Sequence, residues 1–316
     1  MSGIYEKETL FDHIKGFKEV CSRLIEVAEK EEDKRALEEI LYVGSYNGFN
    51  FCSNMCCYNS PLNFVKRNLS MACMYLQNKE TFDYLVNNEI TLFHGVNANA
   101  LPSILESGLR SYDRLVEEGI NVSTGENYSR RMQGRNFIGF TDVFDLAVDY
   151  SELFSKESRK DALTLGVVIG TTKSKLCESG RVTRVPSELP EIGIKDYYSL
   201  DSINVIGVPS DKLIFVRKLA SNTNIKVLPM DTISDRLFHV DEDYMKVEIN
   251  EKEFSKLKLE LQGKEKKKSP RFSLKELYYL AITRNLTRIR KTIMKFKHIF
   301  DTEKKKEEED NGRKAR

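Results

Sequence analysis

The stretch that decides the fold reads Leu92-Phe93-His94-Gly95-Val96-Asn97. It predicts a strand that delivers a histidine and then a glycine into a loop. Because glycine has no side chain, a ligand can approach the backbone there and meet an N–H and a C=O together. A helical pattern, Ala98 to Ser107, follows, and Gly108 stands where the end of a helix favours left-handed backbone. We therefore expect a ligand to meet the backbone at His94 and Gly95.

A second strand is predicted at Asn136 to Phe140, with Thr141 or Asp142 as the N-cap of the next helix. That helix, Phe144 to Phe154, brings Tyr150 round near its end. Further short apolar runs alternate with turn residues at Ile90 to Phe93, Thr164 to Ile169, Ile203 to Val208, Lys212 to Val216 and Ile225 to Leu228. The mixture predicts an α+β fold, with mainly antiparallel strands and helices packed on the sheet.

The two ends of the chain have a different character from this central part. Residues 1–88 show helical periodicity, with another helix expected from about Leu62 to Gln77. We therefore divide the chain into a helical N-terminal region (1–88), an α+β domain (89–230), a helical, basic C-terminal region (231–300) and a disordered tail (301–316). Within the basic region, Lys264 to Lys297 contains twelve Lys or Arg residues against two acids. A packed helix, a membrane-surface helix and a nucleic-acid-binding arm all fit such a segment. It is the candidate contact for nucleic acid or an anionic surface.

The bulk composition sets few limits on function. Fifty basic residues balance 48 acidic ones, so the net charge is +2 and no bulk field favours nucleic acid. No apolar run approaches the roughly 20 residues that cross a bilayer, and the first residues lack the features of a secretion signal. We expect a cytoplasmic protein with reduced thiols, although delivery into another cell by a different machinery stays open. The spacing of Cys52, Cys56, Cys57 and Cys73 is not that of a zinc site, so buried free thiols and no metal are expected.

The central segment resembles the catalytic domain of poly(ADP-ribose) polymerases and related ADP-ribosyltransferases. Those enzymes open with a strand ending His-Gly and a helix of the form Ile-Leu-x-x-Gly-Leu-Arg, which this chain matches with His94-Gly95 and Ile104 to Arg110. Their second motif, Tyr-Phe-x-Asp followed by a tyrosine, is similar to Gly139-Phe140-Thr141-Asp142 and Tyr150. Their later hairpin is similar to Ser202 to Leu219. The resemblance covers roughly residues 90–220 and implies an antiparallel split sheet with flanking helices.

The resemblance implies roles for individual residues in binding NAD as a co-substrate. His94 would hydrogen-bond a ribose hydroxyl, and Gly95 would pair its backbone with the nicotinamide amide. Tyr150 would stack on the nicotinamide ring, and Arg110 would lie toward the pyrophosphate. The interval Ser111 to Arg135 would cover the donor. Three of these residues also have a structural alternative: His94 as a strand-end histidine, Tyr150 as a core tyrosine, and Arg110 as an arginine at a helix dipole.

Two positions depart from the family pattern. Gly139 stands where the family has its first tyrosine, and Ser202 stands where it has the catalytic glutamate. That carboxylate favours the cationic character that develops as nicotinamide leaves, a stabilisation often central to catalysis. Asp201 is next to Ser202, but adjacent strand residues face opposite sides, so Asp201 replaces the acid only after a register shift or a bulge. Asn204 shares the face of Ser202 and is a polar alternative.

The leading hypothesis is an NAD-dependent ADP-ribosyltransferase that modifies a protein or nucleic acid, as a toxin or defence enzyme would. The alternative is a non-catalytic relative that binds NAD or ADP-ribose, or uses the fold for protein contacts. A transferase that removes a 2′-phosphate from RNA with NAD shares the expected fold and ranks last. Phosphate-binding loops, nucleophile elbows and zinc helices are absent from the sequence, which excludes most other enzyme classes.

Overall fold

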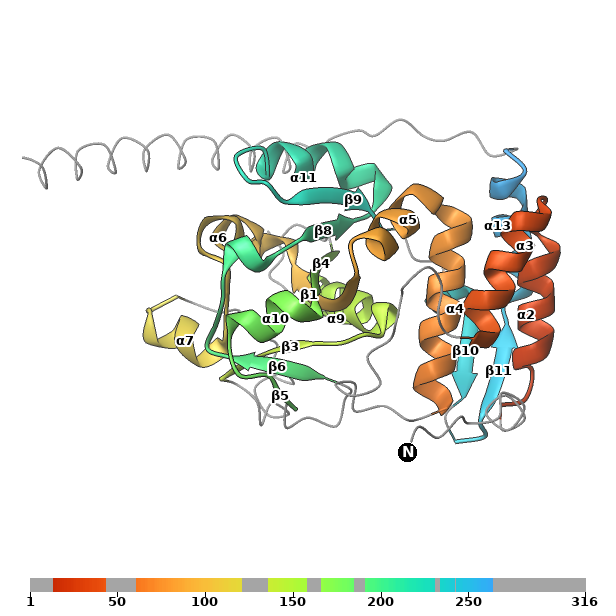
Figure 1. The fold of residues 1–316 in the computed structure, drawn as a ribbon, viewed down its shortest axis with the longest axis horizontal. Helices are drawn as coiled ribbons and strands as arrows, with labels where there is room; N and C mark the ends of the chain where they lie inside the picture. The colour runs from red at the N-terminus through yellow and green to blue at the C-terminus, as the bar shows by residue number, and fades with distance from the viewer. Residues whose placement is uncertain are drawn as a thin grey trace, which may run out of the picture. The chain divides into compact units, whose positions relative to one another are not determined.

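The computed structural model describes residues 14–43, 61–120, 136–157, 166–184, 191–230, 234–241 and 243–263. These residues form both helices and mainly antiparallel strands, so the predicted α+β class is confirmed (Figure 1). Several sequence predictions lie outside the described residues: the part 121–135 of the interval expected to cover the donor, the basic segment 264–297, the tail 301–316, and Cys52, Cys56 and Cys57.

Helices make up the described part of the chain before residue 88. They are α2 (Phe17–Glu26), α3 (Glu31–Glu38), the π-helical turn η1 (Glu39–Val43), α4 (Pro61–Gln77) and α5 (Lys79–Asn87). The helix expected from about Leu62 to Gln77 is therefore confirmed. Helix α5 begins where the Asn78 side chain accepts a hydrogen bond from the Thr81 amide, which satisfies an otherwise unpaired N–H.

The main sheet has four strands in the order β1-β4-β8-β9. They are β1 (Ile90–Asn97), β4 (Gly166–Thr172), β8 (Val205–Val208) and β9 (Lys226–Pro229). Strands β1, β4 and β8 pair antiparallel, as expected, but β8 and β9 pair parallel. A parallel pair needs a crossover connection, and here the crossover is η4 (Ser210–Lys212) followed by α11 (Leu213–Leu219).

This crossover corrects two predictions. The strand expected at Lys212 to Val216 is helical, and the hairpin expected over Ser202 to Leu219 is a strand followed by a helix. The burial pattern gives the reason. Phe215 and Val216 are neighbours and both are fully buried, whereas Ile214 is 45% exposed. A half-buried strand would alternate instead, so the apolar run fits one face of a helix.

A second sheet, in the order β3-β6-β5, lies beside the first. It contains β3 (Phe137–Phe140), β6 (Ile192–Lys195) and β5 (Thr183–Arg184), of which only β3 was expected from the sequence. Two unexpected strand pairs are β2 (Leu109–Arg110) with β7 (Tyr197–Tyr198), and β10 (Phe238–Asp241) with β11 (Lys246–Ile249). The remaining helices are η2 (Ala98–Ala100), α6 (Leu101–Ser107), α7 (Tyr112–Glu117), α9 (Phe144–Glu157), α10 (Lys173–Ser179), η3 (Leu200–Ser202), α12 (Ser234–Leu237) and α13 (Glu251–Leu261).

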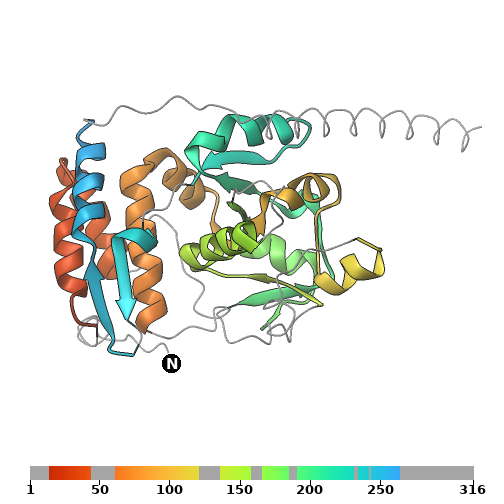
Figure 2. The same cartoon turned by 180° about the vertical axis from the view of Figure 1, so that it is seen from behind.

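Helix α9 is the element that positions the candidate site. It packs on β1 and β4, as both ribbon views show (Figures 1 and 2). Thr141 Oγ1 accepts a hydrogen bond from the Val143 amide at 3.1 Å, in the turn just before the helix begins at Phe144. Asp142, the other candidate cap, instead forms a buried ion pair with Arg67 of α4 at 2.9 Å. The helix continues to Glu157, beyond the predicted end at Phe154, so Tyr150 lies in its middle.

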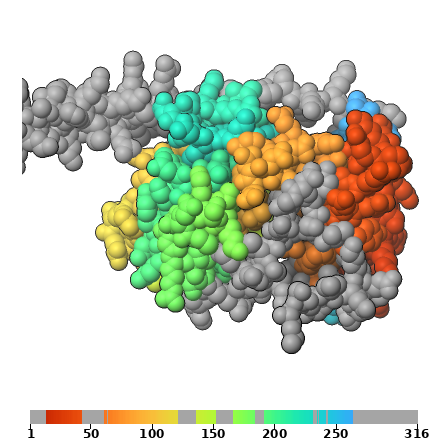
Figure 3. All heavy atoms as spheres, in the orientation of Figure 1, coloured from red at the N-terminus to blue at the C-terminus, as the bar shows by residue number. Residues whose placement is uncertain are grey.

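One cluster of buried side chains joins the N-terminal helices, β1, α9 and the segment 237–257. Arg23 of α2 adds a polar link by pairing with the Glu251 carboxylate of α13 and lying 4.3 Å from the centre of the Phe254 ring. In the space-filling view, atoms of α4 and α5 (orange) lie between α2–α3 (red) and the strand region (green and teal) (Figure 3). The helices are thus continuous with the core under the main sheet.

Candidate functional site at the gap between β1 and β3

Strands β1 and β3 meet at a single bridge. The Phe93 amide donates to the Thr141 carbonyl at 2.8 Å, and the Thr141 amide donates back to the Phe93 carbonyl at 2.9 Å. Apart from this bridge the two strands belong to different sheets, because β1 pairs with β4 and β3 pairs with β6. Among the described residues, no further backbone hydrogen bond joins them, and we call this unpaired stretch, where His94 and Gly95 face Gly139, the gap.

The backbone of Gly95 opens into this gap. In an antiparallel strand the N–H and C=O groups of alternate residues point to alternate sides. Since those of Phe93 point to Thr141, those of Gly95 point to the same side, away from β4. Among the described residues, no backbone hydrogen bond reaches Gly95 from that side. A donor and an acceptor thus stand side by side, complementary to a planar amide.

Helix α9 explains why residue 95 is glycine. A Cβ added to Gly95 would lie 1.9 Å from the Ala147 carbonyl oxygen and 2.8 Å from the Ser151 amide nitrogen. The strand and this turn of the helix are therefore in backbone contact, which no larger residue permits. Tyr150 belongs to the same turn, and its side chain is partly buried. The structure thus places the helical turn that carries Tyr150 against Gly95.

His94 is held across the gap by the backbone of β3. Its Nδ1 lies 2.6 Å from the Gly139 carbonyl oxygen, and its ring centre lies 5.5 Å from that of Phe140. Removal from water lowers the pKa of the imidazole below the ordinary value of 6.5, although the Gly139 carbonyl partly offsets this. The ring is therefore neutral at neutral pH. Because a carbonyl only accepts, we assign the proton to Nδ1, which leaves Nε2 as an acceptor.

The space beside Gly139 is occupied by a carboxylate. A Cβ added to Gly139 would lie 3.0 Å from Cδ and Oε2 of Glu191 and 3.1 Å from its Oε1. The near-equal distances mean that the flat carboxylate group covers Gly139 face-on. Sequence reasoning missed Glu191 because it did not predict β6, which begins at the next residue. The short apolar run Ile192-Gly193-Ile194 after Pro190 was the available signal.

Asp201 and Ser202 stand in the 3-10 turn η3, so the prediction that they lie on a strand is wrong. The Ser199 hydroxyl starts the turn by accepting a hydrogen bond from the Asp201 amide at 3.3 Å. The side chain of Asp201 is exposed, and its carbonyl accepts from Lys175 Nζ at 2.9 Å. Because Asp201 and Ser202 do not lie on a strand, the argument that their side chains point to opposite faces does not apply.

Ser202 belongs to a network of hydroxyl groups. Its Oγ lies 2.9 Å from Ser179 Oγ, and its carbonyl accepts from Thr171 Oγ1 at 2.9 Å and from the Tyr198 hydroxyl at 3.0 Å. Burial raises the pKa of Tyr198 to about 12, so this hydroxyl stays protonated. Asn204 Oδ1 joins the same network, 3.2 Å from Thr171 Oγ1. The contacts of Ser202 and Asn204 thus anchor η3 to β4.

Across the main sheet, the position level with His94 is apolar. His94 pairs with Ile169 of β4, and Ile169 pairs with Ile206 of β8. Directly paired antiparallel residues share a face, so β8 presents an isoleucine in this row. Among the described residues of β8, none is acidic.

The Arg110 guanidinium forms hydrogen bonds with two side chains that lie close to it in the sequence. Its guanidinium donates to Glu118 Oε2 at 2.5 Å and to the Ser103 hydroxyl. The side chain is only 12% exposed. Arg110 thus joins α6 to the end of α7, a structural role different from the helix-dipole contact that the sequence left open.

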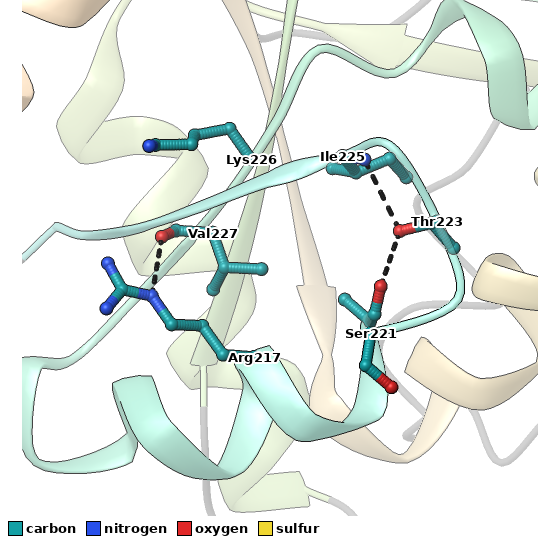
Figure 4. Close-up of a pocket in the computed structure, with 7 residues that line it drawn as sticks. Arg217, Ser221, Thr223, Ile225, Lys226 and Val227 are labelled. Carbon is teal, nitrogen blue, oxygen red and sulfur yellow. Dashed lines mark hydrogen bonds between the residues drawn. The ribbon is translucent and has the colours of Figure 1, made fainter.

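A shallow pocket of about 360 Å³ lies elsewhere, between α11 and β9 (Figure 4). Arg217 Nε donates to the Val227 carbonyl at 3.3 Å across it, and Thr223 Oγ1 bonds the Ala220 carbonyl at 2.8 Å. Arg217 and Lys226 give its lining a positive charge. None of the residues predicted from the sequence to form the site lines this pocket.

Three further properties concern the described ranges alone. No group of three His, Cys, Asp or Glu side chains there is placed to hold a metal ion. Cys21 and Cys73 are buried cysteines, whereas Cys177 is exposed. In the same part of the chain, every helix is too short or too polar to cross a membrane.

No family model matches the chain, and no curated protein matches it. Among solved structures, DarTG of Thermosipho africanus in complex with ADP-ribose is similar over 44% of this chain, with a TM-score of 0.33 and 13% sequence identity. The similar region spans 49% of that chain, about half its length.

Proposed function

We propose that the gap between β1 and β3 binds NAD, and that the chain transfers ADP-ribose from it to a macromolecular acceptor. The observation that carries the proposal is the outward-facing N–H and C=O pair of Gly95. A nicotinamide carboxamide offers the complementary acceptor and donor. Two such hydrogen bonds to a rigid strand favour one orientation of the ring.

The surrounding residues fit the same ligand. His94 is fixed by Gly139 and, as a neutral imidazole, offers Nε2 as an acceptor for a hydroxyl group. Tyr150 lies on the helical turn against Gly95, and its proposed role is to pack its ring on the nicotinamide. Arg110 is left out of this set because Glu118 and Ser103 engage it. NAD supplies the ADP-ribosyl group, which becomes transferable when nicotinamide leaves.

A second candidate function is binding of NAD or ADP-ribose without catalysis. It is favoured by the turn η3, because Ser202 is committed to hydroxyl contacts and Asp201 is exposed to solvent. Asp201 remains the proposed acid only if η3 changes conformation when the ligand binds. A protein or nucleic-acid acceptor belongs to the transferase proposal alone, because a protein that only binds NAD transfers nothing.

One experiment separates the two functions. The full chain is incubated with NAD labelled in its adenylate part and with a cell extract, while free nicotinamide is measured. Label transfer together with nicotinamide release supports the transferase. Measurable NAD binding with neither product supports the binding protein and removes the enzyme. In the transferase case, Asp201→Ala is expected to abolish turnover with NAD affinity nearly unchanged, and full activity in that variant rejects Asp201 as the acid.

A further inference from the structure

The Glu191 carboxylate borders the proposed NAD-binding gap from the side of β3. The bridge between Phe93 and Thr141, continued by two residues along each antiparallel strand, sets Gly139 opposite Gly95. Side chains at 139 and 141 would point to the same face as those at 93 and 95. Helix α9 covers this face at Phe93 and Gly95, and the Glu191 carboxylate covers the same face at Gly139. A ligand amide held by Gly95 would thus place its ring near a negative charge.

Charge at this position distinguishes the two redox forms of the dinucleotide. The carboxamide, riboses and phosphates are the same in NAD and NADH. The nicotinamide ring carries one positive charge in NAD and none in NADH. A carboxylate beside the ring therefore attracts only the oxidised form, with an energy that grows as water is excluded from the contact.

We propose that Glu191 is the residue that selects oxidised, cationic NAD over NADH. This inference rests on the proposed binding of NAD in the gap. The glycine at 139 contributes to this arrangement, since the Cβ of any other residue would lie 3.0 Å from the carboxylate and would push it away by a few tenths of an ångström. The charge thus occupies a place that would otherwise hold a neutral side chain.

The test measures the affinities of the full chain for NAD and for NADH by calorimetry. The wild type is expected to bind NAD more tightly by roughly tenfold, as one charge contact predicts. Glu191→Gln keeps the shape and removes the charge, so the ratio should fall to about twofold or less, mainly through weaker NAD binding. Glu178→Gln, an exposed position on α10, is the matched control and should keep the wild-type ratio.

The outcomes distinguish this inference from the function on which it rests. A wild type that binds NAD, with an unchanged NAD-to-NADH ratio in Glu191→Gln, rejects the role of Glu191 and leaves the NAD site standing. A wild type that binds neither dinucleotide rejects the proposed site and the role of Glu191 together. If the preference for NAD over NADH also fell in Glu178→Gln, the cause would be a general effect of charge, and the assignment to Glu191 would be overturned.

Discussion

At Gly95, the missing side chain serves the contact with helix α9 as well as the proposed ligand. The Ala147 carbonyl and the Ser151 amide are backbone atoms and cannot rotate away from an added carbon. The same close contact orients the free edge of β1 toward β3. A single residue thus sets both the packing of the helix and the accessibility of the backbone.

Gly95→Ala should therefore destabilise the fold. Overpacking against backbone atoms is expected to lower the free energy of unfolding by about 2 kcal/mol or more. Gly119→Ala is the matched control, because its Cβ meets nothing within 4 Å and only its positive φ of 72° opposes the change, at a cost of about 1 kcal/mol. Urea unfolding of both variants measures the difference. Equal losses would mean that α9 does not require glycine at 95.

His94 should make the stability of the protein depend on pH in a defined direction. Its pKa is lowered in the folded state, chiefly by burial. The folded protein therefore binds the proton less readily than the unfolded chain. The stability that His94 contributes is present above its ordinary pKa of 6.5 and is lost as the pH falls below it.

Urea unfolding at pH 8 and at pH 5.5 tests this dependence. The wild type should lose more stability over the interval than His94→Gln, whose amide can still donate to the Gly139 carbonyl. The same pH dependence in both proteins would show that His94 titrates normally.

At the scale of elements, one polar cluster ties three helices together. The Tyr75 hydroxyl of α4 donates to Asp33 of α3 at 2.6 Å, and Lys79 of α5 donates to the same oxygen at 2.9 Å. The Tyr75 hydrogen bond, more than that of Lys79, lowers the pKa of Asp33. The pKa of Tyr75 itself is raised to about 12, mainly by burial. The hydroxyl thus remains a donor to a charged acceptor at all ordinary pH values.

Removing the Tyr75 hydroxyl should loosen this junction. Tyr75→Phe is expected to cost about 1.5 kcal/mol at neutral pH, as for hydrogen bonds to charged groups. Because the pKa of Asp33 is lowered, the loss should persist above pH 3.8 and shrink as the pH falls through the folded pKa. Tyr84→Phe is the control, since its hydroxyl makes no hydrogen bond among the described residues. Equal effects of the two changes in denaturant unfolding would contradict the account.

The elements also show where sequence reasoning succeeds. Strands β1, β3 and β4 and helices α4 and α9 were predictable because their apolar residues recur with the period of the element. Helix α11 was taken for a strand, since seven residues are too few to separate the two periods. Strands β2, β5 and β7 have two residues each, and their pairing depends on distant partners that no local pattern records.

At the scale of the whole molecule, some residues of the candidate site could be predicted from the sequence and others could not. His94 and Gly95 face Gly139, and the turn that carries Tyr150 lies against Gly95, because each residue lies on or beside a regular element; their roles in binding NAD stay predictions. Glu191 could not be predicted, since its carboxylate reaches Gly139 only through the pairing of β6 with β3. Asp201 and Ser202 were misplaced because Ser199 caps a turn where a strand was expected. The core shared with residues 237–257 likewise depends on contacts between distant segments.

Amide hydrogen exchange of the full chain, with and without saturating NAD, tests the central claim most directly. The Gly95 amide faces the gap, so NAD should slow exchange in peptides covering residues 93–97 and 144–151. Peptides covering 213–229, around the separate pocket between α11 and β9, should exchange at an unchanged rate. Protection confined to residues 213–229, or no protection anywhere, would contradict an NAD site between β1 and β3.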